Sequence, residues 1–183
     1  MKKQVSKLTM IAVGLVLAAA LSRLLPHPFN FSPVAAMALF GGAVISNRKL
    51  AFMFPLAALF LSDLFFQLFT NVPGFYGWSQ LINYGAFLLI VLLGTRLHNL
   101  KVMNVALASL AASFLFFLVS NFGVWVVAGG VAPYTHDAAG IWNTYVLAIP
   151  FLGNTVIGDL VYCGILFGGY ALIRRFAMRH SMA

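Results

Sequence analysis

Long runs of apolar residues, separated by short polar or proline-containing segments, follow one another along the whole chain. A helix that crosses a bilayer needs about 20 mostly apolar residues, and most of these runs approach that length. We therefore predict an all-α integral membrane protein: a six-transmembrane-helix bundle that forms a single domain over residues 1–183. The predicted spans cover residues 8–25, 33–46, 50–69, 78–97, 102–128 and 151–173.

Proline residues set two of these boundaries. Pro26 ends the first apolar run, because proline has no backbone N–H to continue a helix. The run over residues 141–173 is too long for one span, and Pro150 and Gly153 offer a break within it. We therefore expect a short interfacial helix over residues 141–149, followed by the sixth span.

The composition agrees with a membrane protein and excludes several other classes. Hydrophobic residues make up 62% of the chain and charged residues only 8%, whereas soluble domains have about 25% charged residues. So few charges cannot cover a water-exposed surface, which excludes soluble globular proteins. The single cysteine excludes a disulfide framework within the chain and a metal site built from cysteines. The sequence has no Walker A sequence, nucleophile elbow or HExxH motif, so we expect no ATP hydrolysis and no enzyme activity that depends on these motifs.

The basic residues predict the orientation in the membrane. If the N-terminus is cytoplasmic, ten of the 11 Lys and Arg residues lie in cytoplasmic tails and loops, and the outer loops hold none. This pattern predicts a multi-pass protein of the bacterial inner membrane with both termini in the cytoplasm and no nucleic-acid partner. The ten residues are Lys2, Lys3, Lys7, Arg48, Lys49, Arg96, Lys101, Arg174, Arg175 and Arg179.

The first predicted span also resembles a signal peptide, because two lysines precede an apolar run that ends in small residues at Ala18–Ala20. Cleavage there would remove the first span and reverse the charge pattern. We therefore expect the span to be retained.

Polar side chains within the predicted spans gather in the outer half of the bilayer. Their depth follows from the rise of about 1.5 Å per helical residue. A polar group inside a membrane is costly and marks a functional site by default. Aromatic and amide residues of the outer loops lie above this layer, as in a pocket that closes over an organic ligand. The predicted substrate-binding residues are His27, Asn30, Asp63, Trp78, Gln80, Asn83, Tyr84, Asn121, Trp125, Asn154 and Asp159.

A structural interpretation of the same polar residues remains open. Arg23 lies near the outer end of the first span, where it would neutralise one aspartate, while the amides would cross-link helices. The outer-loop aromatics also fit an interfacial belt. The histidines are scattered without metal-ligand spacing, so we predict no metal and no other cofactor.

Small residues recur on one face of the first span. Gly14, Ala18 and Ser22 are spaced every fourth position, which places them on the same side of a helix. Such a face lets another helix approach closely, so it either packs within the bundle or receives a partner subunit.

Several segments resemble known membrane families. NFSPVAAMALFGGA at residues 30–43 and LSDL at residues 61–64 are similar to the second and third helices of the substrate-binding S component of energy-coupling factor vitamin transporters. Three further segments resemble a family of small bacterial inner-membrane proteins that is thought to share the S-component fold. These segments cover residues 23–33, 76–80 and 150–159.

The resemblance implies a subunit that captures a vitamin or similar metabolite from outside the cell. Such subunits work with a membrane coupling protein and two cytoplasmic ATPases, and the first helix would dock on the coupling protein. His27, Asp63 and Tyr84 give a distant likeness to the solitary cobalamin S components. Those proteins have a cobalt-coordinating cysteine where this chain has Ser79 and Gln80, so cobalamin is only one candidate substrate.

Three hypotheses follow. The leading one is a transport-associated binding protein, in which the aspartates accept hydrogen bonds or balance a cation, the asparagines orient polar groups and the aromatic residues stack. The second is a structural or assembly protein whose cavity holds lipid. The third is an intramembrane enzyme acting on lipid or quinone, with Asp63 or Asp159 as acid or base.

Overall fold

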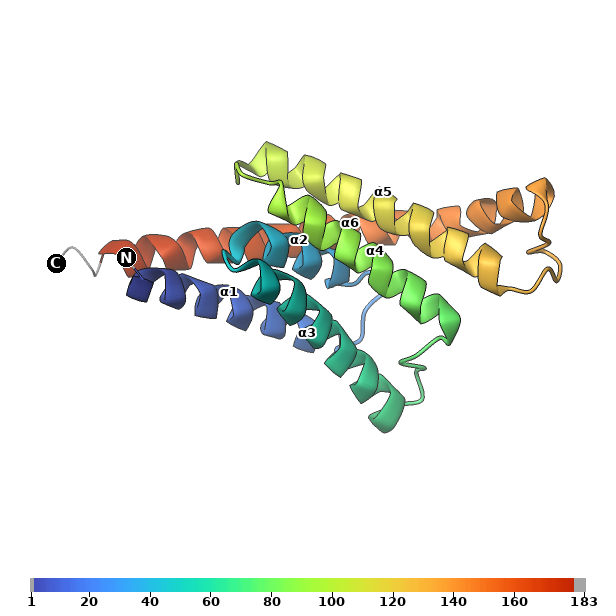
Figure 1. The fold of residues 1–183 in the computed structure, drawn as a ribbon, viewed down its shortest axis with the longest axis horizontal. Helices are drawn as coiled ribbons and strands as arrows, with labels where there is room; N and C mark the ends of the chain where they lie inside the picture. The colour runs from blue at the N-terminus through green and yellow to red at the C-terminus, as the bar shows by residue number, and fades with distance from the viewer. Residues whose placement is uncertain (1, 180–183) are drawn as a thin grey trace.

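The computed structural model describes residues 2–179, with side chains described for residues 7–177, and this part of the chain contains helices but no strand. This confirms the predicted all-α fold. The helices run alternately along one long axis, and the start of α1 and the end of α6 lie at the same end of the bundle (Figure 1). They are α1 (Lys2–Ser22), α2 (Val34–Val44), α3 (Arg48–Phe69), α4 (Trp78–Thr95), α5 (Val102–Val127) and α6 (Ala138–Arg179).

Four of these helices, α3 to α6, are long and apolar enough to cross a bilayer. Four such helices fit an integral membrane protein. The apolar part of α1, Lys7–Ser22, and the whole of α2 are shorter. With 11 residues, α2 is about 16 Å long, roughly half of the ~30 Å hydrocarbon core of a bilayer.

The predicted break near Pro150 is wrong, because α6 continues from Ala138 to Arg179 with Pro150 inside it. A proline removes one helical hydrogen bond, which helices in apolar bundles tolerate when neighbouring helices support them. Pro150 itself is exposed, and α5 holds the turn of α6 that precedes it. The Tyr145 hydroxyl of α6 donates to the carbonyl oxygen of Leu118 at 2.9 Å, and the Tyr145 ring packs on Phe117.

The first turn of α6 is stabilised by Asp137, which directly precedes it. The backbone N–H of Gly140 and the hydroxyl of Thr135 both donate to Asp137 Oδ1 at 2.7 Å. These hydrogen bonds, the one from Gly140 first, lower the pKa of this exposed carboxyl. At 42 residues, α6 is about 63 Å long, more than a bilayer requires. Its first turns therefore extend past the hydrocarbon core.

The short helix α2 occupies the centre of the bundle. It contacts every other helix, and residues 35–42 are buried. Glycines allow the closest approach, between α2 and α4: a Cβ on Gly94 would collide with the carbonyl oxygen of Leu39, and one on Gly42 with that of Val91. Small residues of this kind let two helix backbones touch.

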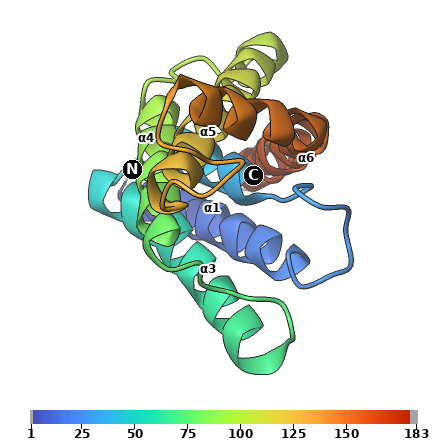
Figure 2. The same cartoon turned by 90° about the vertical axis from the view of Figure 1, so that its right-hand side faces the viewer.

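The end of the bundle opposite the termini, here called the distal end, is more open. The α3–α4 connection and the α5–α6 connection diverge there, as Figures 1 and 2 show from two directions. Because α2 is short, it does not fill the space between them. The candidate site lies in this region.

Replacing Gly94 with Ala tests the contact between α2 and α4. We expect Gly94→Ala to lower the unfolding temperature of the detergent-purified protein, because the added methyl group overpacks the interface at a cost of about 1–3 kcal/mol. Gly85→Ala on the same helix is the control, since its Cβ would meet nothing within 4 Å. Equal unfolding temperatures for the two variants would contradict this packing.

Candidate functional site

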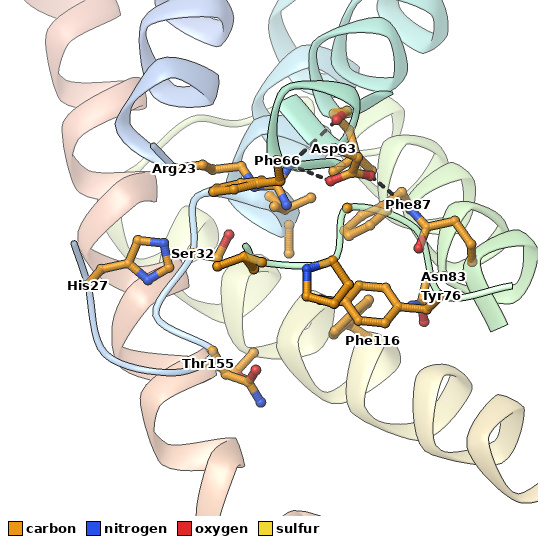
Figure 3. Close-up of a pocket in the computed structure, with 18 of the residues that line it drawn as sticks. Arg23, His27, Ser32, Asp63, Phe66, Tyr76, Asn83, Phe87, Phe116 and Thr155 are labelled. Atoms are coloured by element: carbon orange, nitrogen blue, oxygen red, sulfur yellow. Dashed lines mark hydrogen bonds and ion pairs between the residues drawn. The ribbon is translucent and has the colours of Figure 1, made fainter. Parts of the chain in front are cut away.

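A cavity of about 310 Å³ lies at the distal end, beside the first turn of α2. All six helices or their connections contribute to its wall (Figure 3). This volume is in the range of small-molecule sites, which are about 300–1,000 Å³. The polar lining residues are Arg23, His27, Asn30, Ser32, Asp63, Gln80, Asn83, Thr155 and Asp159. The aromatic lining residues are Phe66, Tyr76, Phe87 and Phe116.

The α1–α2 connection covers one side of the cavity (Figure 3). It turns at Asn30, whose φ of 61° is a left-handed conformation that asparagine tolerates better than most residues. The turn is closed by a hydrogen bond from the Phe31 N–H to the Pro28 carbonyl oxygen. The Asn154 side chain of α6 donates to the carbonyl oxygen of Phe29 at 3.0 Å. Asn154 thus holds this connection rather than lining the cavity.

The α3–α4 connection covers another part through Val72, Pro73, Gly74 and Tyr76. Its position depends on Gly74, whose N–H donates to the side chain of Gln67 at 3.2 Å. A Cβ on Gly74 would collide with the carbonyl oxygen of Asp63. The connection therefore folds back directly against α3 where Asp63 lies.

An ion pair forms one wall of the cavity. Arg23 Nη1, just after α1, lies 2.8 Å from Asp63 Oδ1 of α3. The same nitrogen donates to the hydroxyl of Ser62 and to the carbonyl oxygen of Leu59, and the guanidinium lies 5.5 Å from the ring centroid of Phe66. These contacts fix the end of α1 against α3.

The second oxygen of Asp63 is also occupied. Gln80 Nε2 and the Tyr84 hydroxyl, both from α4, donate to Asp63 Oδ2 at 2.8 and 2.9 Å. Asp63 is only 3% exposed, so these partners replace water around its charge. The network therefore joins α1, α3 and α4 through a single carboxylate. It matches the structural interpretation in which Arg23 neutralises one aspartate.

Asp159 of α6 has a different environment. It is 2% exposed, and the Ser113 hydroxyl of α5 donates to its Oδ2 at 2.7 Å. The backbone amide of Ala36, in the first turn of α2, also interacts with this carboxylate. Asp159 forms no ion pair with any residue that the structure describes. The cavity thus contains one carboxylate with a cationic partner and one without.

The structure brings six of the predicted residues into the cavity wall and places five outside it. Tyr84 lies behind Asp63, and Trp78 is 75% exposed at the start of α4. Asn121 donates to the carbonyl oxygen of Phe117 in its own helix. The residues that line the cavity are His27, Asn30, Asp63, Gln80, Asn83 and Asp159.

Trp125 stabilises the distal tip of the bundle instead of the cavity. Its indole N–H donates to the carbonyl oxygen of Thr135 at 2.8 Å, and its ring packs edge-on against His136. These contacts hold the α5–α6 connection. Asn154, the remaining predicted residue outside the wall, holds the α1–α2 connection as described above.

Several lining residues were not predicted, and neither was Ser113, which contacts Asp159 from outside the cavity wall. Ser113 had a usable signal, because Ser109 and Ser113 lie one turn apart and are the polar members of an otherwise apolar segment of α5. Both are fully buried. Phe87 and Phe116, whose rings stack at a centroid distance of 5.2 Å, had none, because phenylalanine occurs throughout this chain.

The small-residue face of α1 divides between two environments. The Ser22 hydroxyl lies 3.1 Å from the hydroxyl of Tyr162 in α6, so this end packs within the bundle. Gly14 and Ala18 are exposed, and Gly14 lines a groove between α1 and the start of α3. A partner at this face stays a prediction. Among the described residues, no group of three His, Cys, Asp or Glu side chains could hold a metal ion.

Residues 3–180 match the model of DUF6580, a family of unknown function, so the chain belongs to this family. No curated protein and no solved structure matches the chain. The family description assigns no activity and makes no link to S components.

The Arg23–Asp63 pair provides a test of the site's architecture. Removing one member leaves the other as an uncompensated buried charge, which costs about 3–5 kcal/mol. We therefore expect Arg23→Met to lower the unfolding temperature strongly and Asp63→Leu to do the same. The double variant should recover part of the loss, because neither charge remains.

The control is Arg48→Met, which removes an exposed arginine at the start of α3. The unfolding temperature in detergent is measured for all four variants. Additive losses in the double variant would show that the two side chains do not depend on each other.

Proposed function

We propose that this DUF6580 protein is the membrane-embedded substrate-binding component of an uptake system, and that it captures a small vitamin-like metabolite in the distal cavity. The observation that supports this most is the lining of that cavity. It combines stacked rings at Phe87 and Phe116 with polar groups from Asn83 and Asp159, all at a cavity of about 310 Å³. A mostly apolar pocket with a few convergent polar groups is typical of small-molecule sites.

The surroundings of Asp63 favour a cavity that binds a ligand over one in which Asp63 acts as a catalytic base. A general base needs a free oxygen within reach of the proton that it removes. Both oxygens of Asp63 already accept hydrogen bonds, from Arg23 on one side and from Gln80 and Tyr84 on the other. This arrangement weighs against an intramembrane enzyme that uses Asp63.

We propose a topology of six spans with both termini in the cytoplasm of a bacterial cell. The alternating helices place the start of α1 and the end of α6 together, and the distal loops contain no Lys or Arg after Arg23. An excess of basic residues marks the cytoplasmic side. The helix α2 and the α1–α2 connection that lines the cavity would together form the short central span, with α2 buried among the other helices. The cavity would then open to the outside of the inner membrane.

Transport also requires a source of energy that this chain does not show, because it has no ATP-binding motif. We propose that a membrane coupling subunit with cytoplasmic ATPases supplies it, as the resemblance to S components implies. The exposed Gly14 and Ala18 of α1 would allow close approach of a partner helix.

A structural protein with a lipid-filled cavity is the second candidate. The Arg23–Asp63 network favours it, because this network joins three helices and has all of its carboxylate oxygens occupied without a ligand.

Native mass spectrometry and binding measurements across a vitamin and metabolite panel test the proposed function. We expect one small molecule per protein to bind saturably. Asn83→Ala should weaken its affinity about tenfold, because the ligand loses a hydrogen bond to the Asn83 side chain. The matched control is Asn121→Ala, since Asn121 bonds only to its own helix. Bound phospholipid alone, unchanged by either substitution, would favour the structural candidate.

Cysteine labelling in intact cells tests the topology. Asn71 in the α3–α4 connection and Asn99 in the α4–α5 connection are both exposed, and each can be replaced with Cys in a Cys163→Ala background. A membrane-impermeant maleimide should label Asn71→Cys in intact cells, and Asn99→Cys only after permeabilisation. The reverse pattern would place both termini outside.

A further inference from the structure

The charges around the distal cavity do not balance. Two carboxylates, Asp63 and Asp159, line it, and Arg23 is the only Lys or Arg among the lining residues. Arg23 pairs with Asp63. The remaining titratable lining residues are His27, which is exposed in the α1–α2 connection, and Tyr76. Asp159 therefore has no cation to neutralise it within the described residues.

The groups that contact Asp159 stabilise a negative charge without cancelling it. The Ser113 hydroxyl donates to Oδ2, and the Ala36 amide lies in the first turn of α2, where the helix dipole is positive. A carboxylate offers about four lone-pair positions, and these two donors leave some of them unused. An additional donor in the cavity can therefore reach Asp159.

The environment of Arg23 argues against an anionic ligand. Its Nη1 already contacts Asp63, Ser62 and the carbonyl oxygen of Leu59, and its guanidinium carbon lies 5.5 Å from the ring centroid of Phe66. An anion would meet a guanidinium whose charge Asp63 already neutralises. It would also lie in a cavity that already contains Asp159, so like-charge repulsion would oppose it.

Flat apolar surface lies on the same side of the helices as Asp159. Phe116 follows Ser113 by three residues in α5, and Thr155 precedes Asp159 by four in α6, so each pair shares one helix face. Phe116 stacks on Phe87 with the two ring planes only 20° apart. Figure 3 shows Phe87, Phe116 and Thr155 around the cavity.

We propose that the distal cavity selects a positively charged nitrogen base with a flat apolar body. Its N–H groups donate to the carboxylate of Asp159, and its body packs against Phe87 and Phe116. This assignment rests on the proposed function and names the class of substrate for that site. Recognition of a cation by a buried carboxylate uses a charge-assisted hydrogen bond, the strongest kind available here.

Three probes of nearly identical shape and different charge test the assignment: benzamidine (cationic), benzamide (neutral) and benzoate (anionic). The dependence of the unfolding temperature on probe concentration gives an apparent Kd for each. We expect benzamidine to bind roughly ten- to a hundredfold more tightly than benzamide, the gain from one charged hydrogen bond. Benzoate should not raise the unfolding temperature.

Asp159→Asn should reduce the affinity for benzamidine to that for benzamide. Asp137→Asn is the matched control, because Asp137 is exposed outside the cavity and Asn caps a helix equally well. It should keep the wild-type ranking. The ranking on the wild-type protein decides the proposal even where Asp159→Asn does not fold.

Binding of benzamide or benzoate at least as tight as that of benzamidine would overturn the cation assignment and leave the proposed binding function standing. Absence of binding by all three probes would also overturn it, whereas the metabolite panel tests the proposed function independently. Benzamidine binding that persists unchanged in Asp159→Asn would show that another group recognises the cation.

Discussion

The shortness and burial of α2 determine much of the architecture. Its Ala- and Gly-rich sequence lets it contact every other helix, with glycines at the closest approach to α4. Because it has only 11 residues, it fills the half of the bundle nearer the termini and begins only where the distal helices have converged. The surrounding helices are held together at one end and left apart at the other. A cavity beside the first turn of α2 is the direct consequence.

The two buried carboxylates then have different roles. Asp63 joins three helices through Arg23, Gln80 and Tyr84, and both of its oxygens accept hydrogen bonds from these partners. Asp159 holds α6 to α5 through Ser113 and retains unused acceptor capacity. The same cavity therefore has a rigid, neutralised wall and a wall with residual negative charge. Rigid surroundings of this kind lower the entropic cost of binding a ligand.

The fold was largely predictable from the sequence, because long apolar runs set the helices, and four of the six predicted spans begin and end within two residues of a helix. The first helix, α1, begins six residues before its predicted span. The continuity of α6 was not predictable. Helix α6 runs through the exposed Pro150, and α5 holds the turn before it through Tyr145, a tertiary contact that the sequence does not reveal. Depth along the spans was enough to predict Asp63, Asn83 and Asp159, which do line the cavity. It could not separate them from Asn121, since helix rotation, which depth does not reveal, decides which side chains face inward.

The most direct measurement is an experimental structure of the protein purified from its native membrane. We expect density for a compact, non-lipid molecule in the distal cavity, within hydrogen-bond distance of Asp159 and against the rings of Phe87 and Phe116. The Arg23–Asp63 pair should be intact beside it. An acyl chain in the cavity, or helices that close the space beside α2, would contradict the account.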